Sequence, residues 1–239
     1  DEQIAEYVYD LCRTKGYPRH FYAEWAKNTS KRIIKMAEMF GDIAEVTMAF
    51  QSLDPVVLAN IKRHNIKTSE AMAIQKHFAG KKLPTYSDLI LGLPGETTAG
   101  HLAALRTLFD AGVWHIVAWN CQTLKGSVLE TTAQRQLHGI ETKYRLYDIG
   151  FGQYAHITAI EHEEVVRSTH TMSEEETLWF RPIHWLVHFL GHYKYPWQLQ
   201  KYLNSQQIHP VDFILRVFAE KGNASPKVKE IFNNFEKEA

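Results

Sequence analysis

Four apolar segments that alternate with helical patterns constrain the fold of this sequence more than any other feature. The segments are HFYAEWA (20–26), EVTMAFQS (45–52), YSDLILGL (86–93) and HIVAWNCQTL (115–124), and their near-continuous apolar content is typical of strands covered on both faces. Helical spacing predicts helices between them, for example PVVLANIKRH and TAGHLAALRTLFDAG. Strands joined in this way run parallel, so we predict an α/β fold with a parallel sheet over residues 1–127.

The pattern changes after residue 127, and we predict a mainly helical extension over residues 128–239. Residues 128–147 have a helical pattern, and FGQYAHITAIEHEEVVRST favours extended structure. MSEEETLWFRPIHWLVHFLGH begins with a capping sequence and continues as an apolar helix. Aromatic residues concentrate in this part, and their helical spacing favours packing in a core over contact with a partner.

Composition disfavours several classes of protein. The 27 basic and 27 acidic residues cancel, so no overall charge indicates nucleic acid or an anionic membrane. No apolar run approaches the roughly 18–20 residues that cross a bilayer, and no secretory signal opens the chain. Two cysteines, Cys12 and Cys121, fit reduced thiols in a cytoplasmic protein. The chain starts without methionine inside a helical pattern, as we expect for a piece of a longer polypeptide.

Polar side chains and glycines lie at the carboxyl ends of the predicted strands. They lie at WAKN (25–28), QS (51–52), GLPGET (92–97) and NCQTL (120–124). Ligands of parallel α/β folds bind at the carboxyl ends of strands, and glutamine amides suit hydroxyl groups or a base edge. A simpler interpretation stays open, in which the glycines only form a turn and Ser52 and Glu96 only serve the helices that follow them.

These segments resemble parts of the radical S-adenosylmethionine enzymes. SDLILGLPGETTAGHLAALRTLFDAGV is similar to their fifth strand and following helix, TMAFQSLDPVVLANIKRHNI to the fourth strand and helix, and GYPRHFYAEWAKN to the third strand. IEHEEVVRSTHTMSEEE resembles the extension of the subgroup with a cobalamin-binding domain upstream. The resemblance runs, with gaps, over about residues 1–175, and LILGLPGET is its most specific piece.

The resemblance implies a partial (βα) TIM-like barrel that binds S-adenosylmethionine across its strand ends and acts on a small-molecule or unknown substrate. The fifth-strand motif would pack on adenine, the fourth-strand pair would contact the ribose or methionyl part, and the segment after the sixth strand would hold the adenine edge. The implied cofactor-binding residues are Trp25, Asn28, Gln51, Ser52, Ile90, Gly92, Leu93, Glu96, Gln122 and Leu124. No catalytic residue is assigned. A [4Fe–4S] cluster is also implied, and the use of cobalamin is left open.

The sequence departs from the family at the cluster. Family members bind it through a Cys-x3-Cys-x2-Cys loop, which Cys12 and Cys121 cannot supply, and no Asp-x-His-x-x-Gly cobalamin signature occurs. We therefore expect the cluster ligands and any cobalamin domain outside this chain, and we expect the chain alone to be inactive. His184, His188 and His192 share a helix face but lack an adjacent carboxylate, so no metal site is predicted.

Two alternatives remain from the residues alone. One is a (βα) barrel lyase or aldolase, for which Lys27 is the only candidate catalytic lysine at a strand end. The other is a non-catalytic interaction module built on the aromatic-rich extension.

Overall fold

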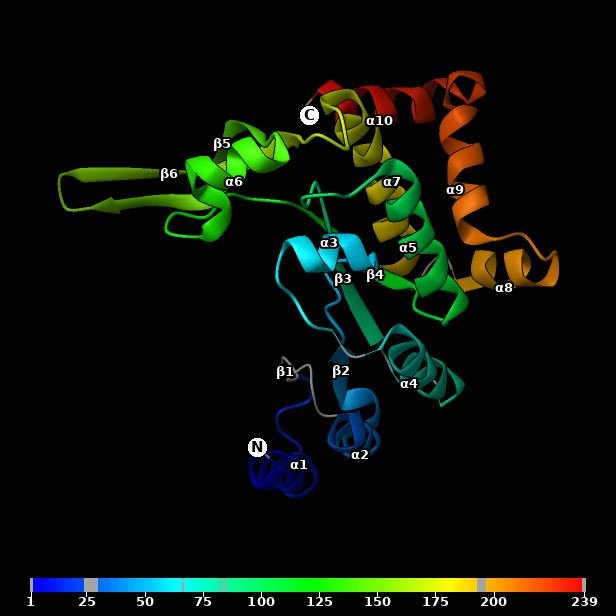
Figure 1. The fold of residues 1–239 in the computed structure, drawn as a ribbon. Coiled ribbons are helices and arrows are strands. Elements are labelled where there is room, and N and C mark those ends of the chain that lie inside the picture. The colour runs from blue at the N-terminus through cyan, green and yellow to red at the C-terminus, as the bar shows by residue number, and fades with distance from the viewer. Residues whose placement is uncertain are drawn as a thin grey trace.

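The computed structural model describes residues 2–23, 30–65, 67–81, 83, 85–192 and 197–237. Figure 1 shows their helices and strands. The first part contains α1 (Glu2–Lys15), β1 (Phe21–Ala23), α2 (Ser30–Phe40), the 3-10 helix η1 (Gly41–Ile43), β2 (Ala44–Thr47), α3 (Pro55–Asn60), α4 (Thr68–Gly80), β3 (Thr85–Leu91), α5 (Thr98–Asp110) and β4 (His115–Asn120). The second contains η2 (Val128–Glu130), α6 (Thr132–His138), β5 (Glu141–Tyr154), β6 (Ile157–Ser168), α7 (Glu174–His192), α8 (Trp197–Ser205), α9 (Pro210–Ala219), η3 (Lys221–Asn223) and α10 (Pro226–Lys237).

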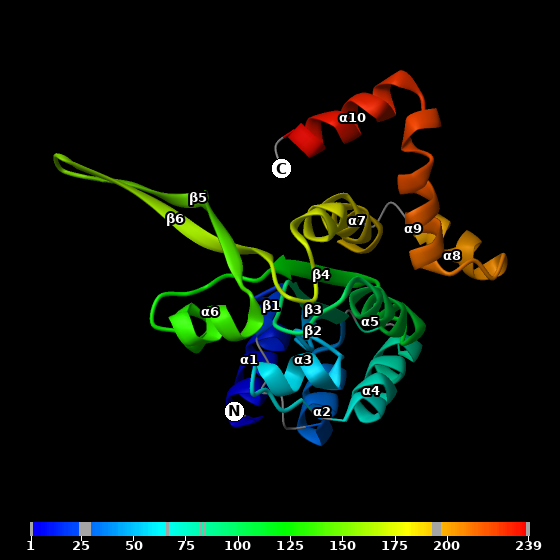
Figure 2. The same ribbon diagram turned by 45° about the horizontal axis from the view of Figure 1, so that its top comes forward.

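The strands β1 to β4 form one parallel sheet in the order of the chain. Leu89 of β3 lies opposite Ala118 of β4 in the register. Helices α2 to α5 lie along one side of the strands, and α7 lies beside β4 (Figure 2). The prediction of an α/β fold with parallel strands is therefore confirmed.

The second predicted strand is shorter than expected because its backbone bulges. Regular pairing of β2 ends at Thr47, and the amides of Phe50 and Gln51 then both donate to the carbonyl of Asp88, at 3.2 and 3.0 Å. Gln51 has a φ of 60°, which a regular strand cannot contain. Two residues thus oppose one on β3, as in a β-bulge, and the amide of Ile90 restores the pairing by donating to the carbonyl of Gln51 at 2.8 Å.

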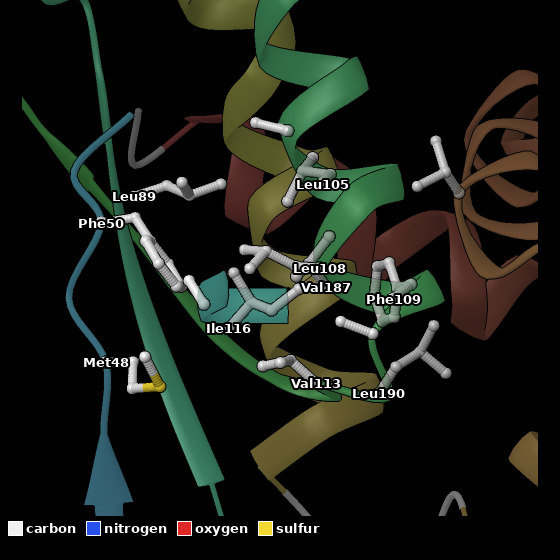
Figure 3. Packing of buried hydrophobic residues seen from close by; sticks show 14 of the residues in the cluster. Met48, Phe50, Leu89, Leu105, Leu108, Phe109, Val113, Ile116, Val187 and Leu190 are labelled. Atoms are coloured by element: carbon white, nitrogen blue, oxygen red, sulfur yellow. The ribbon is translucent and has the colours of Figure 1, made fainter. Parts of the chain in front are cut away.

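The main apolar core joins the sheet to helices from both parts of the chain. Leu89 and Ile116 point from the strands toward Leu105 and Leu108 of α5 and Val187 of α7, and all five side chains are buried (Figure 3). The helical spacing predicted for residues 98–112 therefore does place its leucines inward. Because α7 belongs to the same cluster, the extension packs as a layer of this core.

The extension also contains a long β-hairpin, so the helical prediction for residues 128–147 is wrong in its second half. Helix α6 ends at Gly139, which has a φ of +60°, and an added Cβ there would lie 2.5 Å from Nδ1 of His170. The 14-residue β5 and the 12-residue β6 then pair antiparallel, which confirms the extended structure predicted after residue 150. The hairpin projects from the rest of the molecule (Figure 1). Its exposed apolar side chains are Tyr144, Leu146, Tyr147, Phe151, Tyr154, Ile157 and Ile160.

The aromatic residues of α7 pack mainly against neighbouring helices. Trp179 packs against the main core, and Trp185 stacks on Phe235 of α10 with ring centroids 5.3 Å apart. The prediction that these side chains serve packing is confirmed for both tryptophans. Within the described ranges, neither α7 nor any other helix is long and apolar enough to cross a membrane.

Candidate functional site

The turn after β3 requires its glycines because its backbone adopts positive φ angles. Gly92 and Gly95 have φ angles of +85° and +88°, which disfavour side chains. An added Cβ at Gly95 would lie 2.5 Å from Nδ2 of Asn60, which donates to the carbonyl of Pro94 at 3.0 Å. Thr97, and not Glu96, caps α5, since its hydroxyl accepts from the amide of Gly100. The bare backbone thus lets α3 pack closely on the turn.

Glu96 holds this turn and connects it to the extension. Its Oε2 accepts from the amide of Gly92 at 2.7 Å, and its Oε1 lies 2.7 Å from Nδ1 of His101. Nε2 of His101 lies 2.9 Å from Nε2 of His184 on α7. Burial, and then the nearby His101, hold the pKa of His184 well below its usual value. This chain of polar groups, buried at Glu96 and His101 and half-buried at His184, links the strand-end turn to α7, and nothing in the sequence pattern predicted it.

Two residues of the loop after β2 have different roles, one in starting the next helix and one as a candidate for ligand binding. Oγ of Ser52 accepts from the amide of Asp54 at 3.1 Å, and Asp54 caps α3 through a 2.7 Å bond from Val56, with Pro55 in the first turn. Ser52 therefore shapes the helix start. Oε1 of Gln51, in contrast, is buried and has no hydrogen-bond partner among the described residues. A donor group of a ligand would satisfy it.

The segment after β4 is fixed between β3 and the base of the hairpin. The amide of Cys121 donates to the carbonyl of Leu91 at 2.8 Å, and the carbonyl of Cys121 accepts from Val166 of β6 at 2.9 Å. The amide of Thr123 donates to the carbonyl of Glu164 at 3.0 Å. The hairpin base therefore closes over the carboxyl ends of β3 and β4.

An open pocket of about 770 Å³ lies at this junction, and we name it the strand-end pocket. Its lining residues come from the ends of β3 and β4, the following segment and the hairpin. They are Ile90, Leu93, Trp119, Asn120, Cys121, Gln122, Leu124, Leu129, Arg145, Tyr147, His162 and Glu163. The volume lies in the range of small-molecule sites, and the walls combine apolar side chains with a few polar ones, as such sites do.

Polar contacts orient the pocket walls. Nε2 of Gln122 and Nε of Arg145 both donate to the carboxylate of Glu163. The indole of Trp119 donates to Oδ1 of Asp88 at 2.8 Å, which fixes a ring that is 54% exposed. A fixed, exposed aromatic plane beside a hydrogen-bonded amide can stack on a flat ring and bind its polar edge.

The structure brings together part of the predicted set. Ile90, Leu93, Gln122 and Leu124 all line the strand-end pocket. Gly92 and Glu96 form the neighbouring turn, and Gln51 and Ser52 lie on the adjacent loop, so these four do not line it. Trp25, Asn28 and Lys27 lie outside the described residues. The contributors from the hairpin were not predicted, because no local pattern indicates that β5 returns to the strand ends.

The cysteines are poorly suited to metal binding. Cys121 is 3% exposed, and burial, with the charge of Glu96 as a second cause, raises its pKa to about 12. The thiol form therefore dominates at neutral pH, whereas an iron ligand must be a thiolate. In the part of the chain that the structure describes, no group of three His, Cys, Asp or Glu side chains is placed to hold a metal ion.

Fold and site together define an α/β protein with a ligand-sized pocket at the carboxyl edge of a parallel sheet. No protein-family model matches the chain. Over 146 residues, or 59% of this chain, it is 28% identical to the cobalamin-dependent radical SAM methyltransferase TokK of Streptomyces tokunonensis. Over 115 residues, or 47%, it is 30% identical to the 2-(S-pantetheinyl)-carbapenam-3-carboxylate methyltransferase of Streptantibioticus cattleyicolor. These matches support a relationship to radical S-adenosylmethionine enzymes.

The chain corresponds to only a small part of these relatives. The matched residues make up 21% of the first protein and 17% of the second. The activity, cofactors and substrates of a whole enzyme are therefore matters for proposal.

Proposed function

We propose that this chain is part of a radical S-adenosylmethionine methyltransferase and supplies part of its adenosine and substrate pocket. The observation that carries the proposal is the strand-end pocket, in which four of the residues implied by the resemblance meet: Ile90, Leu93, Gln122 and Leu124. The similarity to two methyltransferases supports it independently. In this proposal, the parallel sheet is a segment of a (βα) barrel.

Each wall of the pocket has a role in binding. Ile90 and Leu93 present apolar surface to the adenine, Trp119 offers a plane for stacking, and the amide of Gln122 binds the polar edge of the base. The unsatisfied Oε1 of Gln51, on the neighbouring loop, accepts from a ribose hydroxyl or the methionyl amine. Bound S-adenosylmethionine supplies the methyl group or the adenosyl group of the reaction. These residues bind and orient the cofactor, and no proton transfer is assigned to them.

The [4Fe–4S] cluster does not fit this chain. Cys12 and Cys121 are both buried, and the raised pKa of Cys121 keeps it in the thiol form. The ligands of the cluster, and any domain that binds cobalamin, therefore belong to other parts of the enzyme. The chain alone is then inactive.

The test uses the full-length polypeptide purified without oxygen. About four irons per polypeptide and formation of 5′-deoxyadenosine or S-adenosylhomocysteine on reduction are expected. Absence of both iron and cofactor cleavage contradicts the assignment to this enzyme class.

A matched pair of variants tests the pocket itself. Leu124→Trp fills the pocket from a side chain that is 62% exposed, so it does not overpack the core. Leu137→Trp, on α6 and 63% exposed, makes the same change outside the pocket. Leu124→Trp should weaken S-adenosylmethionine binding by about tenfold or more, as expected from steric exclusion, while Leu137→Trp should leave it unchanged. Equal binding by both variants would place the cofactor elsewhere.

A further inference from the structure

Three polar side chains, Glu96, His101 and His184, form a continuous row from the strand-end turn to α7, and we name them the polar row. Glu96 accepts from the amide of Gly92 with Oε2, and its Oε1 lies 2.7 Å from Nδ1 of His101. Nε2 of His101 lies 2.9 Å from Nε2 of His184. His184 also lines a hollow of about 250 Å³ beside α7. The polar row therefore connects the turn beside the strand-end pocket with a second hollow.

Aromatic packing fixes the two imidazole rings of the row. Phe180 of α7 is fully buried, and its ring meets that of His101 edge-on, with the centroids 4.8 Å apart. The same ring stacks on His184 with the centroids 5.3 Å apart. Because one core side chain contacts both rings, neither imidazole can turn without disturbing the core. The fold itself thus keeps the three polar groups in line.

The hydrogen-bond donors of the row have one consistent order. An ionised carboxylate only accepts, so the proton between Glu96 and His101 lies on Nδ1 of His101. Nε2 of a neutral His101 then accepts, and the proton between the two rings belongs to Nε2 of His184. Nδ1 of His184 is left without a proton. In this order each contact of the row joins one donor to one acceptor.

An additional proton would change this order. The vacant nitrogen is Nδ1 of His184, and transfer of the Nε2 proton from His184 to His101 then makes His101 an imidazolium beside Glu96. The imidazolium would neutralise the carboxylate and weaken its hydrogen bond with the amide of Gly92. Burial and the neighbouring His101 oppose such a proton, because they keep the pKa of His184 well below its usual value.

The other groups near His184 do not favour the proton either. The titratable side chains that face it are Arg145 of β5, Arg181 and His188 of α7, and His101 of α5. These side chains carry a positive charge or none. Among the described residues that line the hollow, β4 and α10 contribute no titratable group. The row is therefore built to stay without the additional proton at neutral pH.

We propose that His101 and His184 are positioning residues of the strand-end turn: they hold Glu96 on the amide of Gly92, and an additional proton on the row releases this hold. Leu93 follows Gly92 and lines the strand-end pocket, so the turn fixes one wall of that pocket. The effect on a bound cofactor rests on the function proposed above, whereas the effect on the turn does not.

Nitrogen NMR of the 239-residue chain tests the proton order directly. Protonated and unprotonated ring nitrogens differ in their ¹⁵N shifts, so each histidine reveals which nitrogen carries its proton. At neutral pH the proton of His101 should lie on Nδ1 and that of His184 on Nε2. A proton on Nε2 of His101, or on Nδ1 of His184, overturns the proposal.

The amide signal of Gly92 tests the positioning. It should lie downfield at neutral pH, because the amide donates to a carboxylate, and it should move upfield as the pH falls toward acid unfolding. His184→Gln keeps a donor for His101 but cannot titrate, so the movement should be lost. His188→Gln, in the same hollow and one turn further along α7, is the control and should retain it. No movement in the wild type, or the same movement in wild type and His184→Gln, contradicts the proposal.

Two variants of His101 separate the two ends of its ring. The amide nitrogen of asparagine can occupy the place of Nδ1, so His101→Asn keeps a donor for Glu96, whereas His101→Gln reaches only the place of Nε2. Circular dichroism first establishes that both variants are folded. The Gly92 signal should stay in place in His101→Asn, without the pH response, and should lie upfield in His101→Gln. Equal Gly92 signals in the two variants contradict the positioning role.

Cofactor binding separates this proposal from the proposed function. In the full-length polypeptide, His101→Gln should bind S-adenosylmethionine about fivefold more weakly than His101→Asn, as expected for the loss of one hydrogen bond. Equal binding by the two variants overturns the effect on the cofactor. Absence of binding by the wild type contradicts the proposed function instead, and the Gly92 signal still decides whether the row positions the turn.

Discussion

Replacing Gly95 by alanine should destabilise the protein through two separable effects. The first is backbone strain, since a side chain at a φ of +88° costs about 1–3 kcal/mol. The second is contact, because the new Cβ would lie 2.5 Å from Nδ2 of Asn60. Asn60 must then move and lose its 3.0 Å bond to the carbonyl of Pro94, which costs about 0.5–1.5 kcal/mol. The sum is about 1.5–4.5 kcal/mol.

Gly126 provides the control that isolates the contact. It has a φ of +79°, but an added Cβ there meets no atom within 4 Å. Gly126→Ala therefore introduces strain alone, and the loss of unfolded-state entropy that alanine brings is common to both variants. Equilibrium urea unfolding should show Gly95→Ala to be less stable than Gly126→Ala by about 1 kcal/mol.

Removing Asn60 completes the test. In an Asn60→Ala background the contact is gone, so the difference between the two glycine variants should disappear. If Gly95→Ala costs no more than Gly126→Ala with Asn60 present, the close approach of α3 does not explain this glycine.

Three further outcomes follow from the buried groups. Because the pKa of His184 is lowered in the folded state, the unfolded chain binds a proton that the native chain does not, and stability should fall as the pH drops below about 6.5. Between pH 7.5 and 5.5 the urea midpoint should fall less in His184→Gln than in the wild type. An equal fall in the two proteins would contradict this. In a Cys12→Ser variant, Cys121 should react slowly with a thiol reagent at pH 8 and rapidly in urea, since its native pKa is about 12; rapid native reaction would refute its burial. Phe180→Ala should cost about 3–5 kcal/mol because the ring is fully buried, whereas Phe151→Ala on the exposed hairpin should cost little; similar urea midpoints for the two would be inconsistent with the core described.

Local patterns predicted the elements whose side chains divide clearly between inside and outside. Leu105 and Leu108 of α5 recur at helical spacing and are buried, and Asp54 with Pro55 marks the start of α3 as observed. The hairpin lacks such a division, since Tyr144, Leu146 and Phe151 are all exposed. Without a buried face, no strong apolar period distinguishes a strand from a helix, and the helix predicted over residues 128–147 continued past Gly139, where α6 ends.

The pocket was predictable only where strand ends supply it. Leu93 and Gln122 lie at the carboxyl ends of predicted strands, so the topology of a parallel sheet brings them together. Arg145 and Glu163 reach the same pocket from a hairpin, through long-range pairing that local sequence does not encode. Trp119 is an aromatic residue of the kind expected to be buried in a core strand. It is nevertheless 54% exposed, because its face of β4 opens into the pocket.

The shared core determines where this chain could be opened by protein engineering. Val187 and Ile214 of the extension are buried in one cluster with Leu108 and Ile116, so ending the chain at residue 127 would leave α5 and β4 facing water. The tip of the hairpin, around Ala155, is instead distant from every buried cluster (Figure 1). An inserted tag or a new pair of termini should be tolerated there, and the point where the chain changes from βα units to its extension is the wrong place to divide it.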